Sequence, residues 1–287
     1  MARDAGGRGV GAASPWRRAG LVLVAALAVV AVLIGLFWAL QRQLMYHPDA
    51  TPVGEVADRV DGAEDVVLQT EDGLDLGAWL VPPQGGDRET AVLYLPGNGG
   101  NRAGRLETAQ AIAAHGFTVL LVDYRGYGGN PGSPSEEGLA HDARAAVALL
   151  RDRGFEPART LYVGESIGTG VASGLVVTDP PAGVLLRSPF TSFAEVVDGH
   201  APFPARRLVR DEYPSAADLR SSDVPVTILY GDADGVVPPR LSAELATQVP
   251  NLVDEVVVPG AGHNDSLWFG EFLAEAVVAL ADVAVSD

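Results

Sequence analysis

The hydrophobic pattern changes character once along this chain of 287 residues. Residues 19–40 form an apolar run without a single charged side chain. About 20 such residues suffice to cross the hydrocarbon core of a bilayer as a helix. From residue 64 onward the apolar positions instead form short runs of strand length, separated by segments with helical spacing. The pattern predicts one membrane-spanning helix followed by an α/β domain.

Strand and helix segments alternate along the second part of the chain. Two strands flank the turn Asp72-Gly73 within residues 64–83. Alternation of this kind is typical of a mostly parallel central sheet with helices on both faces. The further expected strands are 90–97, 117–126, 160–166, 182–190, 225–234 and 251–260, and the expected helices are 102–116, 135–154, 167–178, 239–249 and 265–284.

The same pattern predicts the domain organisation. A short basic arm (1–18) precedes the transmembrane anchor (19–40), and a linker (41–63) leads to the α/β domain (64–287). Residues 191–223 interrupt the alternation and are rich in proline, so we expect a lid-like insertion there.

Arginines set the expected orientation of the anchor. Arg17 and Arg18 directly precede the apolar run. The positive-inside rule therefore keeps the arm in the cytoplasm and places the large domain outside it. A cleaved signal peptide is the alternative, but it needs small residues at −1 and −3, and cleavage after Ala39 would place Phe37 at −3. The sequence favours an uncleaved anchor.

Composition excludes several kinds of chemistry. The chain has no cysteine, which removes disulfides, zinc–thiolate sites and cysteine nucleophiles. All 20 basic residues are arginine, so lysine-dependent phosphate loops and Schiff bases are excluded as well. The first 42 residues carry +4 and the total is −17, which leaves −21 on the remainder. A domain with this much negative charge repels the phosphates of nucleic acids, so we expect no nucleic-acid partner.

The sequence Gly-Glu-Ser-Ile-Gly at 164–168 contains the first candidate catalytic residue, Ser166. In a chain with 34 glycines a G-x-S-x-G match is weak evidence by itself. Its context adds weight, because Ser166 ends a predicted strand and a predicted helix follows at once. Parallel sheets place their sites at such strand ends, and flanking glycines tolerate the sharp turn of a nucleophile elbow.

A serine nucleophile needs a base and an acid, which should follow it in the order acid, then histidine. His263, in the loop "PGAGHND" after a late strand, satisfies that order. Asp232 and Asp234 are the candidate acids, and Asp234 is preferred because it lies further past its strand; Glu195 is a distant third. The expected oxyanion donors are the backbone N–H of Ile167 and one from the loop 95–102, with Asn98 the best candidate there.

These motifs together resemble a known family. The chain is similar to the α/β-hydrolases, in the membrane-anchored Bem46-like branch related to the serine aminopeptidase type. The resemblance runs from about Tyr46 to the C-terminus and rests on "LPGNGGN" (95–101), "DYRGYGGNPGSPSEEGL" (123–139), "GESIGTG" (164–170), "RSPFTSF" (187–193), "YGDADGVVP" (230–238) and "GAGHND" (260–265). Two departures are Pro96 and Tyr230, where the family usually has histidine.

The resemblance implies an α/β-hydrolase fold and hydrolysis of esters, thioesters or amides, with no cofactor and no metal. By resemblance Ser166 is the nucleophile, Asp234 the acid and His263 the base, with Asn98 and Ile167 as oxyanion donors. It leaves Asp123 and Arg125 a structural role.

The substrate is less defined by the sequence. A tether beside a bilayer suggests lipidic esters or acylated proteins. Aromatic residues that could line an acyl pocket are Phe193, Phe203 and Trp268, with Tyr213 and Phe269, although helix packing explains Trp268 and Phe269 equally well. An aminopeptidase or amidase of the same fold, or a non-catalytic envelope scaffold, is the alternative function.

Overall fold

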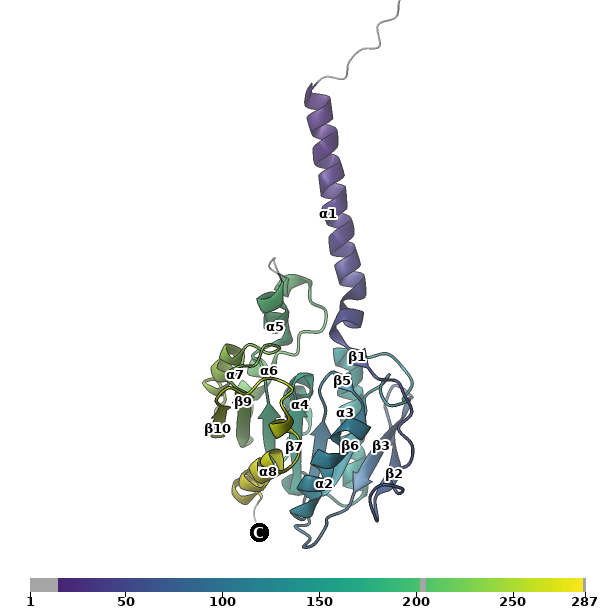
Figure 1. Ribbon diagram of the computed structural model, residues 1–287, viewed down its shortest axis with the longest axis vertical. Coiled ribbons are helices and arrows are strands. Elements are labelled where there is room, and N and C mark those ends of the chain that lie inside the picture. The colour runs from purple at the N-terminus through teal and green to yellow at the C-terminus, as the bar shows by residue number, and fades with distance from the viewer. Residues whose placement is uncertain (1–14, 202–204, 286–287) are drawn as a thin grey trace, which may run out of the picture. The chain divides into compact units, whose positions relative to one another are not determined.

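A computed structural model of the chain describes residues 15–201 and 205–285 (Figure 1). The chain divides into two compact units, Met1–Gln41 and Arg42–Asp287. The predicted basic arm, 1–18, lies mostly outside the described residues.

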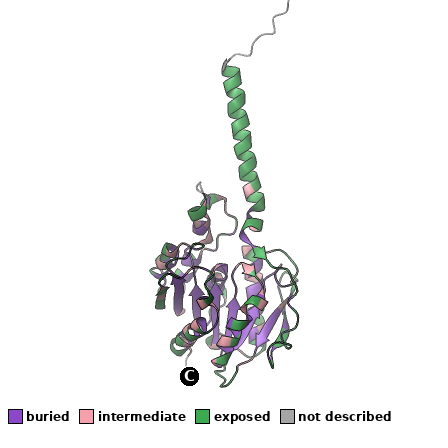
Figure 2. Cartoon of the chain, in the orientation of Figure 1, coloured by how far each residue is buried: buried purple, intermediate pink, exposed green. Residues whose placement is uncertain are grey.

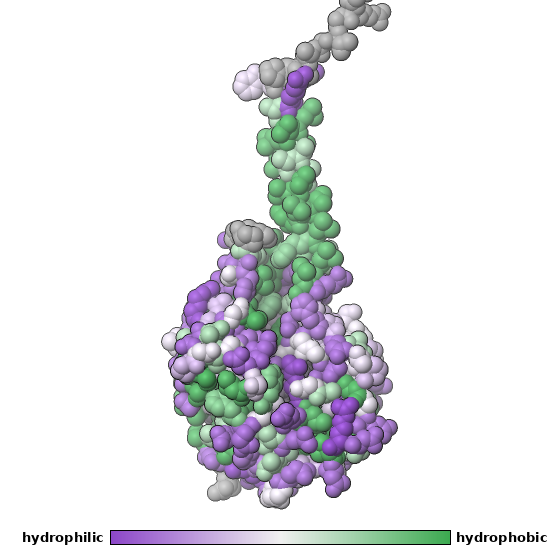
Figure 3. All heavy atoms as spheres, in the orientation of Figure 1, coloured by the Kyte–Doolittle hydropathy of each residue, from purple (hydrophilic) through white to green (hydrophobic). Residues whose placement is uncertain are grey.

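The first unit consists of most of helix α1 (Pro15–Met45). Its side chains between residues 16 and 40 are almost all exposed, and they are predominantly apolar (Figures 2 and 3). The stretch Trp16–Met45 is long and apolar enough to cross a membrane. This helix fits a membrane anchor, and it extends beyond the predicted 19–40 at both ends.

The second unit is built on an eight-stranded sheet. Its strand order is β10-β9-β8-β7-β4-β6-β3-β2, in which β3 runs antiparallel to both of its neighbours and the other pairings are parallel. The strands are β2 (Glu64–Gln69), β3 (Asp75–Val81), β4 (Ala91–Leu95), β6 (Thr118–Val122), β7 (Thr160–Glu165), β8 (Gly183–Arg187), β9 (Val226–Gly231) and β10 (Leu252–Val258). A separate two-residue pair joins β1 (His47–Pro48) to β5 (Gly99–Gly100).

Helices cover both faces of the sheet. One hydrophobic cluster packs α3 (Glu136–Asp152), α4 (Ile167–Thr178), α6 (Ser215–Arg220) and α7 (Pro239–Ala246) against one face. The other packs α2 (Leu106–Ala114) and α8 (Glu271–Ala284) against the opposite face. The central strands β4 and β6 are buried at every position, which explains why they read as continuous apolar runs rather than as alternating ones.

The N-terminal part of this unit differs from the predicted linker, 41–63. Met45 and Tyr46 are buried, and Val53, Val56 and Val60 pack into the same cluster as α2 and α8. The chain is therefore part of the folded unit from Arg42 onward.

The predicted insertion, 191–223, contains local structure. It holds α5 (Phe193–His200), a 3₁₀ turn (Arg206–Leu208) and α6. Ser192 caps α5 by accepting a hydrogen bond from the N–H of Glu195.

The parallel strands have their carboxyl ends at one edge of the sheet, so the loops that follow β4, β6, β7, β8, β9 and β10 meet there.

Candidate active site

Ser166 occupies a strained turn between β7 and α4. Its φ is 52° and its ψ is −116°, values that residues other than glycine rarely adopt. Its N–H donates to the carbonyl of Arg187 on the neighbouring strand at 2.9 Å. Strained backbone of this kind concentrates at functional sites, where the surrounding structure holds it in place.

The flanking glycines make this turn possible. A Cβ on Gly164 would lie 2.7 Å from the carbonyl oxygen of Gly168, and a Cβ on Gly168 would lie 2.1 Å from that of Leu95. Both distances are far inside van der Waals contact, and the obstructing atoms are backbone. The two glycines let α4 begin directly against β4 and β7, which leaves Ser166 at the apex of the turn.

Ser166, His263 and Asp234 form a hydrogen-bonded chain. The Nε2 of His263 lies 3.1 Å from the Oγ of Ser166, and its Nδ1 lies 2.7 Å from the Oδ2 of Asp234. His263 and Asp234 are buried, and Ser166 is half-buried. The structure thus brings together three residues that are 97 and 29 positions apart in the sequence.

Asp234 is fixed on both of its carboxylate oxygens. Its Oδ1 accepts hydrogen bonds from the N–H groups of Val236 and Val237, both at 2.8 Å. Burial by itself raises the pKa of Asp234, but the hydrogen bond and charge of His263, with these two N–H groups, outweigh it and lower the pKa below its ordinary value. The carboxylate therefore stays ionised beside the imidazole.

The other candidate acids lie elsewhere. The Oδ1 of Asp232 accepts a hydrogen bond from the N–H of Gly260 at 2.6 Å, so it joins two loops. Glu195 accepts a hydrogen bond from Thr191 and pairs with Arg206 at 2.9 Å. Neither carboxylate contacts His263 among the contacts of the described residues.

A buried ionic cluster, which sequence reasoning did not single out, lies next to Ser166. Glu165 is paired with Arg105 at 2.9 Å and with Arg187 at 2.8 Å, and it accepts the hydroxyl of Tyr94 at 3.0 Å. Burial raises the pKa of Glu165, but the two guanidinium groups outweigh it and lower that pKa to about 2. Arg187 also donates to the carbonyl of His263 at 2.7 Å, and so connects the elbow to the histidine loop.

The loop after β4 approaches the same strand end. A Cβ on Gly97 would meet Glu165 Oε1 at 3.0 Å and the Cβ of Ser166 at 3.4 Å, so this backbone passes directly over the elbow. Among the described residues, no acceptor is hydrogen-bonded to the N–H of Asn98 or to that of Ile167. Asp123, at the end of β6, holds the loop by accepting from the N–H and the Nη1 of Arg102, both at 2.7 Å.

Comparison with known proteins agrees with this fold. The family described as "Serine aminopeptidase, S33" matches residues 86–211. The protein Rv2307c of Mycobacterium tuberculosis is 47% identical over 261 residues, which cover 90% of this chain and 93% of that protein. The chain belongs to the α/β-hydrolase family.

Within this α/β-hydrolase family the chain falls among the Bem46-like proteins. The lysophosphatidylserine lipase ABHD12 of Danio rerio is 35% identical over 219 residues, covering 62% of this chain and 56% of that protein. The solved Pyrococcus furiosus esterase Pf2001 has a TM-score of 0.68 at 21% identity, covering 84% of this chain and 100% of that one, and so supports the shared fold.

The aromatic residues expected around an acyl pocket of this hydrolase have different environments. Phe193 is half-buried, with its ring edge-on to Phe190 at 5.8 Å and to Tyr213 at 6.4 Å. Trp268 is fully buried in the cluster with α8, and its indole N–H donates to the carbonyl of Gly262 at 2.6 Å. These contacts correspond to a packing role for Trp268, in which it supports the histidine loop. Phe203 lies outside the described residues.

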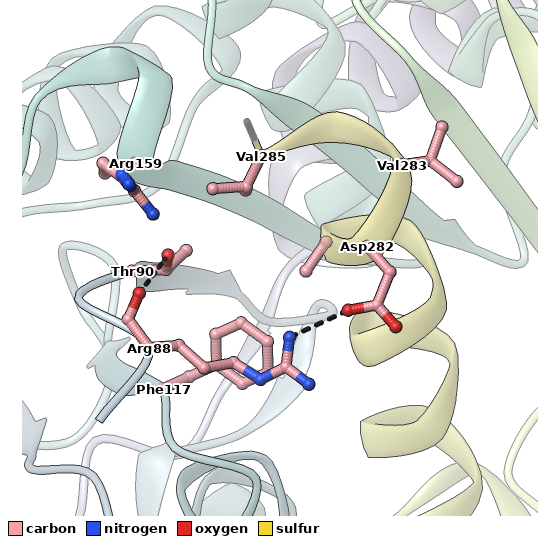
Figure 4. A pocket seen from close by; sticks show the side chains of 8 residues that line it. Arg88, Thr90, Phe117, Arg159, Asp282, Val283 and Val285 are labelled. Atoms are coloured by element: carbon pink, nitrogen blue, oxygen red, sulfur yellow. Dashed lines mark hydrogen bonds and ion pairs between the residues drawn. The ribbon is translucent and has the colours of Figure 1, made fainter. Parts of the chain in front are cut away.

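A separate groove opens at the other edge of the sheet. It measures about 640 Å³ and is lined by residues before β4 and β7 and at the end of α8, including Arg88, Arg159 and Asp282 (Figure 4). Arg88 pairs with Asp282 at 2.9 Å across it. Since Ser166 follows β7 whereas Thr90 precedes β4, this groove is not part of the strand-end site. Within residues 15–201 and 205–285, no cluster of histidine and carboxylate side chains is arranged to hold a metal ion.

Proposed function

We propose that this α/β-hydrolase is a serine hydrolase that cleaves carboxylic ester or thioester bonds through an acyl-enzyme. The observation that carries the proposal is the hydrogen-bonded chain from Ser166 through His263 to Asp234, built on a strained serine at a strand end. A nucleophile, a base within hydrogen-bond reach and a group that orients the base are the three parts that this chemistry needs.

In the proposed mechanism, Ser166 attacks the substrate carbonyl while the Nε2 of His263 takes its proton. Asp234 holds the Nδ1–H tautomer and stabilises the imidazolium that forms. His263 then protonates the leaving group, which departs and leaves the acyl group on Ser166. Water attacks this ester with His263 again as the base, and the acid product leaves with Ser166 regenerated.

The proposed oxyanion donors are the backbone N–H groups of Ile167 and Asn98. Asn98 lies in the loop after β4 and Ile167 is the first residue of α4, directly after Ser166. Among the described residues, neither N–H is hydrogen-bonded to another group. Donors held in place before the reaction stabilise the developing charge without further reorganisation. Pro96 does not alter this assignment, because it precedes the loop's glycine and supplies no donor in any case.

We further propose a lipidic or small acyl substrate at the membrane surface. Two features support this: the apolar helix α1, and the similarity to a relative whose name describes a lysophosphatidylserine lipase. Phe193, whose ring is half-buried, remains a candidate for the acyl-binding wall. Phe203 stays a prediction, because it lies outside the described residues.

The test uses the full chain in detergent with a fluorophosphonate probe and p-nitrophenyl esters of increasing chain length. Wild type should label and turn over, and Ser166→Ala and His263→Ala should lose both by a factor of about 10⁴ or more. Circular dichroism should show that all three proteins are folded. Folded wild-type protein that neither labels nor turns over would disprove the hydrolase and support a non-catalytic scaffold.

An aminopeptidase or amidase is the second candidate, favoured by the match to the serine aminopeptidase family. The same machinery serves an amide, provided that the leaving amine is protonated. Aminoacyl p-nitroanilides distinguish the two functions. A kcat/KM for these amides above that for the matched esters would assign the chain to amide hydrolysis.

A further inference from the structure

The segment that follows the membrane helix pairs with the loop proposed to bind the oxyanion. β1 and β5 run parallel, with His47 opposite Gly99 and Pro48 opposite Gly100 (Figure 1). The N–H of His47 donates to the carbonyl of Asn98 at 3.1 Å. Along the chain, β1 comes two residues after the last residue of α1.

Asn98 is held at both its side chain and its carbonyl. Its Nδ2 donates to the carbonyl of Met45. Its carbonyl oxygen accepts from His47 and also from the hydroxyl of Tyr127 at 2.9 Å. The side chain, the carbonyl carbon and the backbone nitrogen of Asn98 are all bonded to one tetrahedral Cα, so fixing the side chain and the carbonyl also fixes the position of the nitrogen that carries the N–H.

These hydrogen bonds matter because the glycine-rich loop around Asn98 could otherwise adopt many backbone conformations. Asn98 lies between Gly97 on one side and Gly99 and Gly100 on the other. Glycine has more accessible backbone conformations than any other residue, so an unanchored loop would spread over many of them. An oxyanion donor is effective only when it is held in position before charge develops.

The juxtamembrane segment, residues 42–47, also contacts the predicted insertion, residues 191–223. Arg42 makes two hydrogen bonds to the carboxylate of Asp211, both at 2.8 Å. The hydroxyl of Tyr46 lies 2.7 Å from that of Tyr213. Tyr46 and Tyr213 are buried, and burial raises the pKa of each phenol. The segment thus connects residues of the insertion to the loop after β4.

We propose that residues 45–47, which lead out of the membrane helix, are a positioning element for the oxyanion donor of Asn98. The inference rests on the proposed serine hydrolase function, since it concerns the same site. The N–H of His47 and the carbonyl of Met45 act through Asn98 and do not touch the substrate. The catalytic unit accordingly begins with the end of the anchor and not at residue 64.

The test removes one hydrogen bond at a time from the full chain in detergent. His47→Pro deletes the N–H that holds the Asn98 carbonyl, whereas His47→Ala removes the imidazole and keeps the N–H. Thr51→Pro is the matched control: it also creates a Pro-Pro pair, and among the described residues the N–H of Thr51 donates to the exposed carboxylate of Asp49 and to no other group. Asn98→Ala removes the hydrogen bond to the carbonyl of Met45, and Tyr127→Phe removes the hydroxyl that donates to the carbonyl of Asn98.

We expect His47→Pro and Asn98→Ala to lower kcat by about 10- to 100-fold with KM within about twofold, because a misplaced oxyanion donor weakens the transition state and not substrate binding. The loss of kcat should be smaller in His47→Ala than in His47→Pro. Tyr127→Phe should also lower kcat, and Thr51→Pro should have the kcat of wild type. The rate of fluorophosphonate labelling should follow kcat.

A wild-type kcat in folded His47→Pro and Asn98→Ala would overturn the positioning role, as would equal losses in His47→Ala and His47→Pro. If His47→Pro does not fold, Asn98→Ala and Tyr127→Phe decide by the same criterion. Failure of the proposed function is a different result, because wild type itself would then not label.

Discussion

At the scale of single residues, the site depends on backbone conformations that only certain side chains permit. The positive φ of Ser166 costs about 1–3 kcal/mol. The turn is held by contacts on both sides of it. The backbone carbonyl of Arg187 accepts from the N–H of Ser166. Thr169 donates its N–H and its hydroxyl to the carbonyl of Ser166 at 2.9 and 2.6 Å. The backbone geometry of Ser166, the proposed nucleophile, is thus set by hydrogen bonds from its neighbours and not by its own hydroxyl.

Alanine substitutions of two glycines in α4 should have opposite effects. Gly168→Ala places a Cβ 2.1 Å from the carbonyl of Leu95, so β4 and α4 must separate, and we expect a loss of about 4 kcal/mol or more, or no folding. Gly174→Ala meets nothing closer than 3.8 Å and should stabilise the helix by about 0.5–1 kcal/mol. Urea unfolding measures both, and equal stabilities would contradict the close approach.

The buried carboxylate of Glu165 should make stability depend on pH in acid. Its folded pKa of about 2 lies below the ordinary value of about 4.3 for glutamate. The depressed pKa contributes stability that is present above pH 4 and is lost as pH falls toward 2, by about 3 kcal/mol in total. Relative to wild type, Glu165→Gln should lose less stability between pH 5 and pH 2. Parallel stability curves would show that Glu165 is not held ionised.

At the scale of elements, the sequence predicted the helices and strands that have a periodic or continuous apolar pattern, and it missed segments that have neither. Helix α4 has the predicted bounds, 167–178, because a buried strand ends and an apolar helix begins at one serine. The β1–β5 pair was not predicted, since two residues of strand have no periodicity to detect. The segment 41–63 was taken for a linker, because its buried valines follow no regular spacing and gain their contacts only from α2 and α8.

The candidate site follows the same division. Chain order and strand ends were enough to select Ser166, Asp234 and His263, since each follows its own strand. The sequence preferred Asp234 to Asp232 because Asp234 lies further past its strand, and the structure places Asp234 beside His263. The cluster around Glu165 was missed because its partners come from three distant elements. A charged residue inside an apolar strand end was the available signal.

The side chain of Arg187, on β8, contacts Glu165 at the end of β7 and the carbonyl of His263. Substituting it should therefore destabilise more than β8 alone. Arg187→Met would leave Glu165 buried with Arg105 as its remaining charged partner, and we expect a loss of about 3 kcal/mol. The double variant Glu165→Gln/Arg187→Met should lose less. Arg153→Met, which breaks an exposed pair with Glu64, is the control and should cost under about 1 kcal/mol. Additive losses in the double variant would argue against direct coupling.

At the scale of the whole molecule, charge and apolarity are segregated along the chain. A basic arm and an apolar helix precede a body that carries −21, and the first catalytic loop contacts begin within a few residues of the helix. The residues that end α1 also contact the loop beside Ser166. Under the proposed function, anchoring and catalysis therefore depend on the same stretch of chain.

The orientation that the arginines predict can be tested with the chain's own lack of cysteine. Positive charge before the apolar run should keep residues 1–18 in the cytoplasm and the hydrolase unit outside. Single cysteines introduced as Ser14→Cys and as Ala158→Cys, an exposed position in the second unit, are therefore the only thiols present. In intact spheroplasts a membrane-impermeant maleimide should label the cysteine at 158 and should reach the one at 14 only after permeabilisation. The reverse pattern would place the hydrolase in the cytoplasm, and loss of the cysteine at 14 from the mature protein would show that the helix is cleaved.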